Sequence, residues 1–254
     1  MSSAQPLVQD WLNTVDDHGG RLELTPESWH ELPELVEAYS LKGLETVPQN
    51  GSVIERHDEA VAFNFEAHLC DPDGEPVGLI HRRLDTAVAH AEHEELQLPA
   101  DLQGDGRGKA SICAAVELYL ALGLEGVSLY AGNVGSYVWA QCGFDFADPE
   151  TREDFLAAAE ELFSELGFAG SLESAQRPWD LMRIDETVTL KQVVNARVDG
   201  PMDSEIPGEP DSRIELGKAL LLASPHAGWH GVLDLEPKSP GRVQLARYAG
   251  CHGE

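Results

Sequence analysis

The sequence predicts an α+β protein of the α/β three-layer type, in which a mixed central sheet carries helices on its faces. Three observations favour this fold class. Two β-prone stretches, 61–69 and 77–84, flank a DPDG turn; the glycine-rich stretch 104–108 separates an extended segment from an apolar helical pattern; and a short strand and a second helix follow. A hairpin followed by strand, turn, helix, strand and helix is the order expected for a sheet covered by helices.

The sequence of the N-terminal third of the chain predicts a helix, then a loop, and then a β-hairpin. Thr25 suits an N-cap and Pro26 the first helical position, so a helix is expected within residues 25–45. Pro33 interrupts this pattern, which leaves either one kinked helix or two short ones. Residues 46–60 are interpreted as loop.

The central third predicts the core of the sheet. Residues 87–98 alternate in their second half and are expected to end as a strand, whereas the first half suits a strand or a helix. Residues 110–122 predict a helix that Gly123 ends. The remaining elements expected here and beyond are a strand at 127–130, a helix at 133–141 ended by Gly143, a strand at 144–146, and a helix capped by Thr151 over 151–166.

The C-terminal hundred residues carry weaker patterns. Residues 188–198 suit either a strand or a helix, residues 201–212 a loop, residues 214–222 a helical or extended segment, and residues 229–235 a strand. The GWHG segment at 228–231 either lines an acceptor site or forms an ordinary turn into that strand. The expected organisation is an N-terminal helical segment (1–60), a core (61–168) and a C-terminal extension (169–254).

Composition excludes several function classes. The chain has 254 residues and a formal charge of −28 at pH 7, from 45 acidic and 17 basic residues. Nucleic acid is therefore not expected as a partner, because its binding relies on Lys and Arg. The acidic surface either attracts cationic substrates such as amines or serves only solubility. No cysteine pair has C-x-x-C spacing, the N-terminus lacks an apolar leader, and no run of about 18 apolar residues occurs. We therefore expect a cytoplasmic protein with reduced thiols and no membrane partner.

The glycine-rich turn predicts an anion site. Gly104, Gly106 and Gly108 expose consecutive backbone N–H groups where a helix begins, and the helix dipole favours negative charge there. A Walker loop is disfavoured because Ala110 stands where that loop has Ser or Thr. A dinucleotide loop is disfavoured because the third glycine comes one residue early and Glu125 precedes the next strand. The remaining choices are another phosphate site or a bare tight turn.

Two segments resemble the signatures of the GNAT acyltransferase superfamily. Gln103-Gly104-Asp105-Gly106-Arg107-Gly108 resembles that family's Q/R-x-x-G-x-G/A motif, with Leu98 and Leu102 in typical lead-in positions. The segment 133–144, NVGSYVWAQCGF, resembles the second signature, an Asn that opens a short helix closing with Gly-Phe. The resemblance covers residues 61–146, and Ala100 stands where the family usually has Pro.

The resemblance implies a splayed sheet that holds acetyl-CoA or another acyl-CoA as co-substrate. Its pyrophosphate would lie on the N–H groups of the glycine turn, and its pantetheine arm would pair with the strand that ends at Leu98. Arg107 and Lys109 would add positive charge. The residues implied for cofactor binding are Leu96, Leu98, Gln103, Gly104, Asp105, Gly106, Arg107, Gly108, Lys109, Ala110, Asn133 and Trp139.

The implied reaction is attack of an amine, from a small molecule or a peptide, on the thioester. A base must take the amine proton, and the strand before the loop offers His90 and Glu94. Regular alternation places His90, Glu92 and Glu94 on the face of Leu96 and Leu98, with His93 and Glu95 on the other. The alternative is a solvated strand face. No metal site is expected, because His90 and His93 point apart.

The departing thiolate benefits from an acid, which in this family is often a Tyr five residues before the Phe of Gly-Phe. Trp139 stands there, and Tyr137 lies roughly 200° around the helix. Either the thiolate leaves unaided, or Tyr137 or another group serves, or the domain does not catalyse. Trp139 itself either walls the acyl pocket or is a core residue. The competing hypotheses are therefore an N-acyltransferase, a non-catalytic acyl-CoA-binding module of the same fold, and a nucleotide-dependent dehydrogenase.

Overall fold

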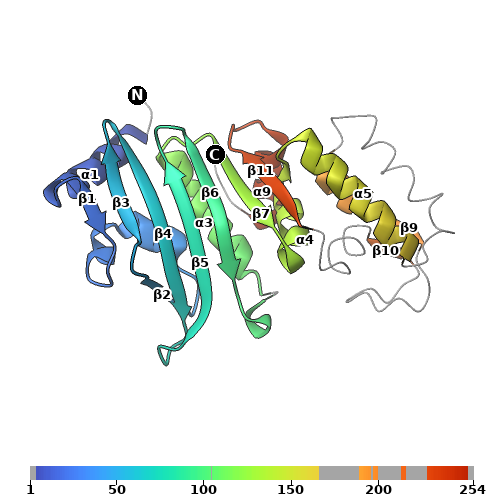
Figure 1. The fold of residues 1–254 in the computed structure, drawn as a ribbon, viewed down its shortest axis with the longest axis horizontal. Helices are drawn as coiled ribbons and strands as arrows, with labels where there is room; N and C mark the ends of the chain where they lie inside the picture. Colours follow the sequence, from blue (N-terminus) through green and yellow to red (C-terminus); the bar gives the residue numbers. More distant parts are fainter. Residues whose placement is uncertain are drawn as a thin grey trace. The chain divides into compact units, whose positions relative to one another are not determined.

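The computed structural model describes residues 4–103, 105–165, 189–195, 197–199, 213–215 and 228–250. The chain divides into two compact units (Figure 1). Unit 1 comprises Met1–Leu129 and Asp234–Glu254, and unit 2 comprises Tyr130–Leu233. The arrangement of the two units relative to each other is not determined.

Unit 1 is built on a mixed, mostly antiparallel open sheet, which confirms the predicted α+β class with a mixed sheet flanked by helices. Its strands run in the order β1, β3, β4, β5, β6 and β7, and β2 also pairs with β4. All of these pairs are antiparallel except β6 with β7, which is parallel. Their bounds are β1 (Arg21–Glu23), β2 (Glu45–Pro48), β3 (Val53–His57), β4 (Ala60–Cys70), β5 (Pro76–Asp85), β6 (His90–Gln97) and β7 (Gly126–Ala131).

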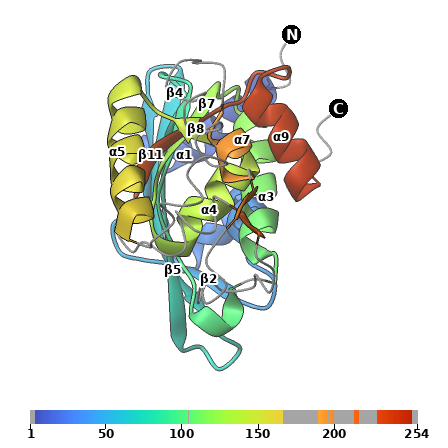
Figure 2. The ribbon, with the colours of Figure 1, turned by 90° about the vertical axis from the view of Figure 1, so that its right-hand side faces the viewer.

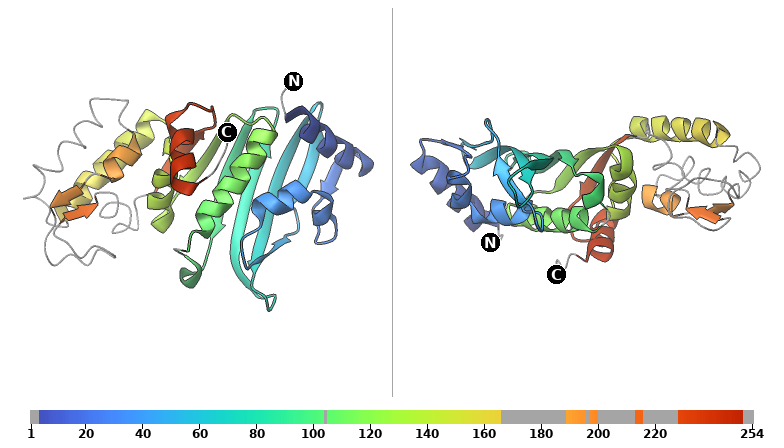
Figure 3. Two further views of the ribbon diagram at one scale, coloured as in Figure 1. Left: turned by 180° about the vertical axis from the view of Figure 1, so that it is seen from behind. Right: turned by 90° about the horizontal axis from the view of Figure 1, so that it is seen from below.

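The helices of unit 1 cover one face of this sheet, the rear face in Figure 1 and the front face in the left view of Figure 3. They are α1 (Ala4–Asp17), the 3-10 helix η1 (Ser28–Glu31), α2 (Pro33–Tyr39), η2 (Ala100–Leu102), α3 (Arg107–Ala121) and α9 (Pro240–Ala249). Helices α1, α2 and α9 all contact α3. Within the described part of unit 1, no helix lies on the opposite face of the sheet.

The core of unit 1 lies between the sheet and these helices. Side chains in cross-strand register form buried rows, the most apolar of which comprises Ile54, Phe63, Leu84, Ala91 and Val127. Aromatic rings extend the core toward the helices: Trp29 stacks on Phe65 with ring centroids 4.7 Å apart, and Tyr39 stacks on Phe65 at 5.4 Å. Rows of this kind form because alternate residues of each strand face the same side.

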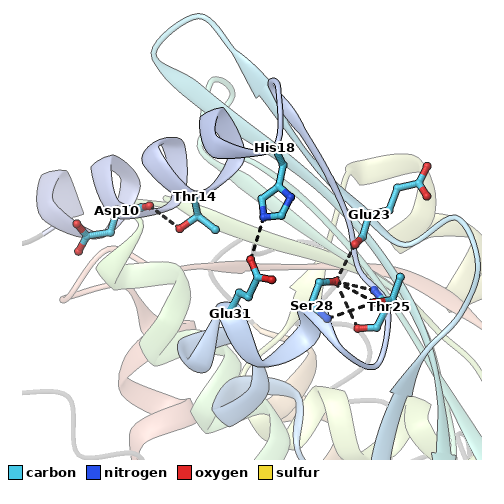
Figure 4. A network of polar contacts seen from close by, with 7 residues as sticks. All are labelled: Asp10, Thr14, His18, Glu23, Thr25, Ser28 and Glu31. Atoms are coloured by element: carbon cyan, nitrogen blue, oxygen red, sulfur yellow. Dashed lines mark hydrogen bonds and ion pairs between the residues drawn. The ribbon is translucent and has the colours of Figure 1, made fainter.

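The N-terminal region agrees with the sequence only in part. Pro33 begins α2 directly after η1, so two short helices form and not one kinked helix. The expectation of a loop over 46–60 is wrong, because β2 and β3 lie there. Helix α1 was not predicted. The His18 ring at its end contacts Glu31 of η1 at 2.9 Å, and the Ser28 hydroxyl donates to the Glu23 carbonyl at 2.8 Å (Figure 4).

Unit 2 contains short strands and helices (Figure 2). Strand β8 pairs with β11, and β9 pairs with β10, both antiparallel. The predicted cap of α5 is wrong: this helix begins at Pro149, and the Asp148 carboxylate accepts from the Thr151 N–H at 2.7 Å. The elements are α4 (Asn133–Cys142), β8 (Asp145–Phe146), α5 (Pro149–Glu165), α7 (Leu190–Val194), β9 (Arg197–Asp199), β10 (Arg213–Glu215) and β11 (Trp229–Asp234).

The cysteines depart from the expectation of four reduced thiols. Cys70 and Cys142 are free and buried. Cys113, on α3, is disulfide-bonded, so the expectation is wrong for this residue. Among the described helices, none is both long enough and apolar enough to span a membrane.

Candidate functional site

The glycine turn links β6 to α3 and presents backbone to open space. Gly106 precedes α3 with a φ of 87°, a left-handed conformation that glycine adopts without a Cβ penalty. A Cβ added to Gly106 or Gly108 would meet no atom within 4 Å other than those of its chain neighbours, so no residue distant in sequence packs against these two positions. The Gln103 amide donates to the Leu98 carbonyl at 2.7 Å, which closes the turn onto the end of β6. Gly104 lies outside the described residues.

The charged side chains of the turn contact each other or α9. The Asp105 carboxylate accepts from the Arg107 N–H at 3.1 Å and from the Arg107 Nε at 2.5 Å. The hydrogen bond from the Arg107 side chain lowers the pKa of Asp105. Lys109 Nζ lies 4.0 Å over the ring of Tyr248 on α9. A carboxylate therefore occupies the N-terminus of α3 at the position where an anionic ligand would bind.

Strand β6 extends beyond its parallel partner. The β6–β7 ladder comprises four pairs, from His90–Gly126 to His93–Leu129, whereas β6 continues to Gln97. On its other side β6 pairs with β5 up to Gln97. Among the described pairs, residues 94–97 therefore use only one of the two edges of β6. Leu96 and Leu98, which we predicted to contact the pantetheine arm, are half-buried here.

A β-bulge at Glu94 overturns the predicted division of β6 into two faces. His93 pairs with Arg82 and Glu95 pairs with His81, so Glu94 is an extra residue on β6. Ahead of the bulge, His90 and Glu92 share one face, as predicted, and this face points away from the helices. Beyond it, Leu96 pairs with the buried Ile80 and faces the core with Ala91 and His93. Leu96 therefore does not share a face with His90, and Glu95 does not share one with His93.

Glu94 belongs to a polar chain on the uncovered face of the sheet. Its carboxylate contacts His81 Nδ1 at 2.6 Å and Arg83 Nη1 at 3.3 Å. His81 Nε2 in turn lies 3.1 Å from Asn64 Oδ1. Glu94 lies on the face of the sheet that carries His81 and Arg83, so this predicted base is committed to an ion-pair network.

His90, the other predicted base, has a different environment. Its Nε2 lies 2.9 Å from the Ser128 hydroxyl on β7. Burial lowers the pKa of His90, and the negative charge of Glu92 opposes this shift. The ring is therefore neutral at neutral pH and able to accept a proton.

A second polar chain is buried between the sheet and the helices. His93 Nε2 lies 2.8 Å from the Tyr119 hydroxyl, which lies 2.9 Å from the Tyr39 hydroxyl. Arg82, 1% exposed, donates from Nη1 to the carbonyls of His81, at 2.7 Å, and Glu95. Burial lowers the pKa of Arg82 and, together with the Arg82 charge, holds that of His93 well below its usual range. Burial also raises the pKa of Tyr119 to about 12.

Sequence reasoning missed this buried chain and His81, although one signal was present. In the stretch 77–84, VGLIHRRL, alternation places Arg82 on the same face as Ile80 and Leu84. A strand position that alternates with apolar residues faces the core, so the pattern itself predicts a buried arginine. The bulge has no comparable signal in the sequence of β6.

The remaining predicted residues lie on α4 in unit 2. Asn133 begins this helix, as the resemblance implies, and Gly143 ends it with a φ of 97°. The half-buried ring of Trp139 packs edge-on against Phe144 with ring centroids 5.7 Å apart. A Cβ on Gly135 would lie 3.3 Å from Trp139 Nε1, so the indole covers Gly135 closely. Tyr137, also half-buried, lies on the same helix, and the distance of these residues from unit 1 is not determined.

The GWHG segment begins β11 of unit 2. Trp229 is buried, and the His230 ring packs against Tyr130 with centroids 4.9 Å apart. A Cβ on Gly228 would overlap the end of the Tyr130 ring, so a larger residue there requires Tyr130 to move. The segment therefore leads into a strand, which agrees with the interpretation of an ordinary turn into a strand.

The order of strands argues against the dehydrogenase hypothesis. The strand before the glycine turn is antiparallel to its predecessor, and β6 with β7 is the parallel pair among the described ladders. A doubly wound nucleotide-binding sheet instead requires successive parallel strands joined by helices.

Among known proteins, similarity to this chain was found with solved structures. No known family and no curated protein matches the sequence. Among solved structures, the chain matches one titled "Crystal structure of Nourseothricin acetyltransferase" with 14% identity, over 50% of this chain and 83% of that chain, at a TM-score of 0.29.

Proposed function

We propose that this chain is an N-acyltransferase that moves an acetyl or other acyl group from acyl-CoA to an amine by direct attack in a ternary complex. The observation that carries the proposal is the strand–turn–helix unit of β6, the glycine turn and α3. Gly106 and Gly108 place no side chain of their own over the turn, at the N-terminus of a 15-residue helix. The N–H groups of a first helical turn and the helix dipole favour phosphate at such a position, where the pyrophosphate of CoA would compete with the Asp105 carboxylate for the Arg107 N–H.

The edge of β6 supports the same proposal. Beyond the pair His93–Leu129, residues 94–97 have no β7 partner among the described ladders. The amides of a pantetheine arm pair with a strand edge of this kind as an added strand would. This edge leads directly into the glycine turn, so one extended ligand reaches both.

The reaction requires a proton acceptor, and His90 suits this role better than Glu94. The amine lone pair attacks the thioester carbon, the C–S bond breaks with its electron pair on sulfur, and the amine proton passes to the base. Burial keeps the His90 imidazole neutral, because it lowers the pKa of this group. Glu94 is already paired with His81 and Arg83.

Calorimetry with acetyl-CoA, longer acyl-CoAs and free CoA tests the binding step. We expect saturable binding that Gly108→Val weakens at least roughly tenfold, because the new side chain fills the space over the turn. Ala121→Val adds the same side chain at the other end of α3 and controls for the lower helix propensity of valine. Absence of binding by every ligand at millimolar concentration would refute the proposal. Mass spectrometry of any ligand that copurifies adds an independent identification.

A second candidate is an acyl-CoA-binding module of the same fold that does not catalyse acyl transfer. Trp139 favours it, because an indole packed against Phe144 cannot donate the proton that a tyrosine hydroxyl would give to the thiolate. Binding of CoA without acylation across a broad panel of amines would support this candidate. Clear turnover of any amine would exclude it.

A further inference from the structure

A groove crosses the uncovered face of the unit 1 sheet, the face turned to the viewer in Figure 1. It has a volume of about 480 Å³ and follows strands β3 to β6. Two cross-strand rows in register form most of its surface, namely Glu55, Ala62, Asp85 and His90 in one row, and Val53, Asn64, Arg83 and Glu92 in the other. All of these residues belong to unit 1.

The groove is hollow because its centre is lined by a small residue. Ala62 lies directly between Glu55 and Asp85 in one row, where every other side chain is longer. Directly opposed side chains of neighbouring strands lie about 5 Å apart, so a single alanine leaves room for a small molecule between its neighbours.

The charges around the groove favour a cation. Glu55 pairs with Arg21, and Arg83 pairs with Glu94, so both are neutralised by neighbours. Among the described residues, no ion pair joins Asp85 or Glu92 to a basic side chain. Arg83 stands directly opposite Glu92, His90 directly opposite Asp85, and the Asp85 carboxylate accepts from the Ala87 N–H at 2.7 Å. The carboxylates of Asp85 and Glu92 lie on adjacent strands, in adjacent rows of the same face. The groove thus has a net negative charge that its own residues do not balance.

The rim of the groove adds an apolar surface. Val88, in the turn between β5 and β6, is 69% exposed. The next residue, Ala89, has a φ of 53°, a conformation that costs a non-glycine residue energy. A strained turn therefore holds a large apolar side chain in solvent beside the carboxylates.

We propose that this groove binds an organic ammonium ion, with the nitrogen between Asp85 and Glu92 and the hydrocarbon part against Ala62 and Val88. The groove has ample room for such a ligand, and it matches the ligand in charge and in having one apolar edge. A bare metal ion fits less well, because no group of three or more metal-ligating side chains gathers in the described residues. That the groove binds an organic ammonium ion does not depend on the proposed function. That it is the acceptor site of the acyltransferase does rest on the proposed function, and the acceptor would then be an amine with a short alkyl part.

The test is an NMR titration of the full chain without acyl-CoA, following the Val88 methyl groups and the His90 ring. Three probes of similar size are compared, namely n-butylammonium chloride, sodium butyrate and n-butanol. We expect saturable shifts at both residues with butylammonium and none that saturate with the other two. Asp85→Asn and Glu92→Gln should each weaken the binding of butylammonium roughly threefold to fivefold. The double variant should weaken it about tenfold or more. Glu37→Gln, an exposed residue of α2, removes the same charge and should change nothing.

Several results would overturn the proposal. These are equal shifts with butyrate, an unchanged dissociation constant in the double variant, or shifts that follow dimer formation in sedimentation, which would mean that a second copy covers this face. If a variant fails to fold, the preference of the wild type for butylammonium over butyrate decides by itself. Because acyl-CoA is absent, a negative result here does not affect the proposed function, and failure to bind CoA does not affect the groove.

Discussion

His93 lies in a position where its protonation opposes folding. It is 4% exposed, and Arg82 lies close enough for its positive charge to act with burial against the imidazolium form. Its Nε2 contacts the Tyr119 hydroxyl. A neutral imidazole satisfies this contact without adding a second buried charge beside the guanidinium. The folded chain therefore requires a neutral His93.

We expect acidification to destabilise unit 1 through His93. An unfolded histidine has a pKa of about 6.5, whereas burial holds the folded value well below this. Between those two values the unfolded chain binds one more proton, so the free energy of unfolding falls as the pH drops below about 6.5, by at most ~1.4 kcal/mol per pH unit. Urea unfolding at a series of pH values from 7.5 to 5 measures this slope.

His93→Gln keeps a polar partner for Tyr119 and does not titrate, so its slope over this range should be smaller. His68→Gln, on the other face of the sheet, is the matched control and should keep the wild-type slope. An identical slope in wild type and His93→Gln would contradict the assignment.

The sequence predicts the burial of Arg82 but not its hydrogen-bond partners. Alternation in 77–84 is sufficient to place Arg82 in the core, but it does not identify the acceptors of the guanidinium. One of them is the Glu95 carbonyl beside the bulge. The contact between His81 and Glu94 depends on the pairing register of β5 with β6, which spacing within either strand does not give.

The bulge and Arg82 are coupled features of β5 and β6. Deleting Glu94 restores a regular ladder with the same flanking pairs, His93 with Arg82 and Glu95 with His81. The Glu95 carbonyl would then turn into the ladder and no longer accept from Arg82. We therefore expect the deletion to destabilise the chain by roughly 1–3 kcal/mol, the cost of a buried donor left without its acceptor.

A double-mutant cycle separates this effect from the loss of Glu94 itself. In an Arg82→Met background the guanidinium is absent, and the same deletion should cost at least ~1 kcal/mol less. Urea unfolding of the four proteins gives the coupling energy. Additive costs would mean that Arg82 does not depend on the bulge.

Asp105 is the feature of α3 that bears most directly on ligand binding. Its carboxylate lies at the N-terminus of the helix, bonded to the N–H and the side chain of Arg107. A CoA pyrophosphate would meet this negative charge. Asp105→Asn should therefore strengthen CoA binding roughly threefold to tenfold, the size of one charge repulsion at close range in water. Asp101→Asn on η2 is the control, and calorimetry at constant salt is the measurement. Weaker binding by the Asp105 variant would show that its carboxylate holds the turn in the binding conformation.

The elements best predicted are those with strong local signals. The hairpin of β4 and β5 has a DPDG turn between apolar strands, and α3 and α4 each end at a glycine with positive φ, Gly123 and Gly143. Strands β2 and β3 were missed because they are short and carry many polar residues, and they form by pairing with β4 rather than by local preference. Tertiary pairing overrides weak propensity in such segments.

At the scale of the whole molecule, the net charge of −28 affects the free energy of unfolding more than any single surface ion pair does. The ion pairs of unit 1, such as Arg21 with Glu55 and Arg56 with Asp16, lie at the surface. Exposed pairs contribute about 0–1 kcal/mol each. Repulsion among the excess carboxylates extends over the whole surface and opposes the compact state.

We therefore expect salt to stabilise this chain. Screening shortens the range of the repulsion to about 10 Å at 0.1 M salt, whereas close ion pairs are weakened less. The midpoint of thermal unfolding should rise by several degrees between roughly 0.02 M and 0.5 M NaCl, and equally in KCl, because screening depends on ionic strength and not on the cation. Differential scanning calorimetry measures the midpoint, and a larger rise with tetramethylammonium chloride would instead indicate binding of an organic cation. A midpoint that falls with salt would mean that the surface ion pairs outweigh the repulsion.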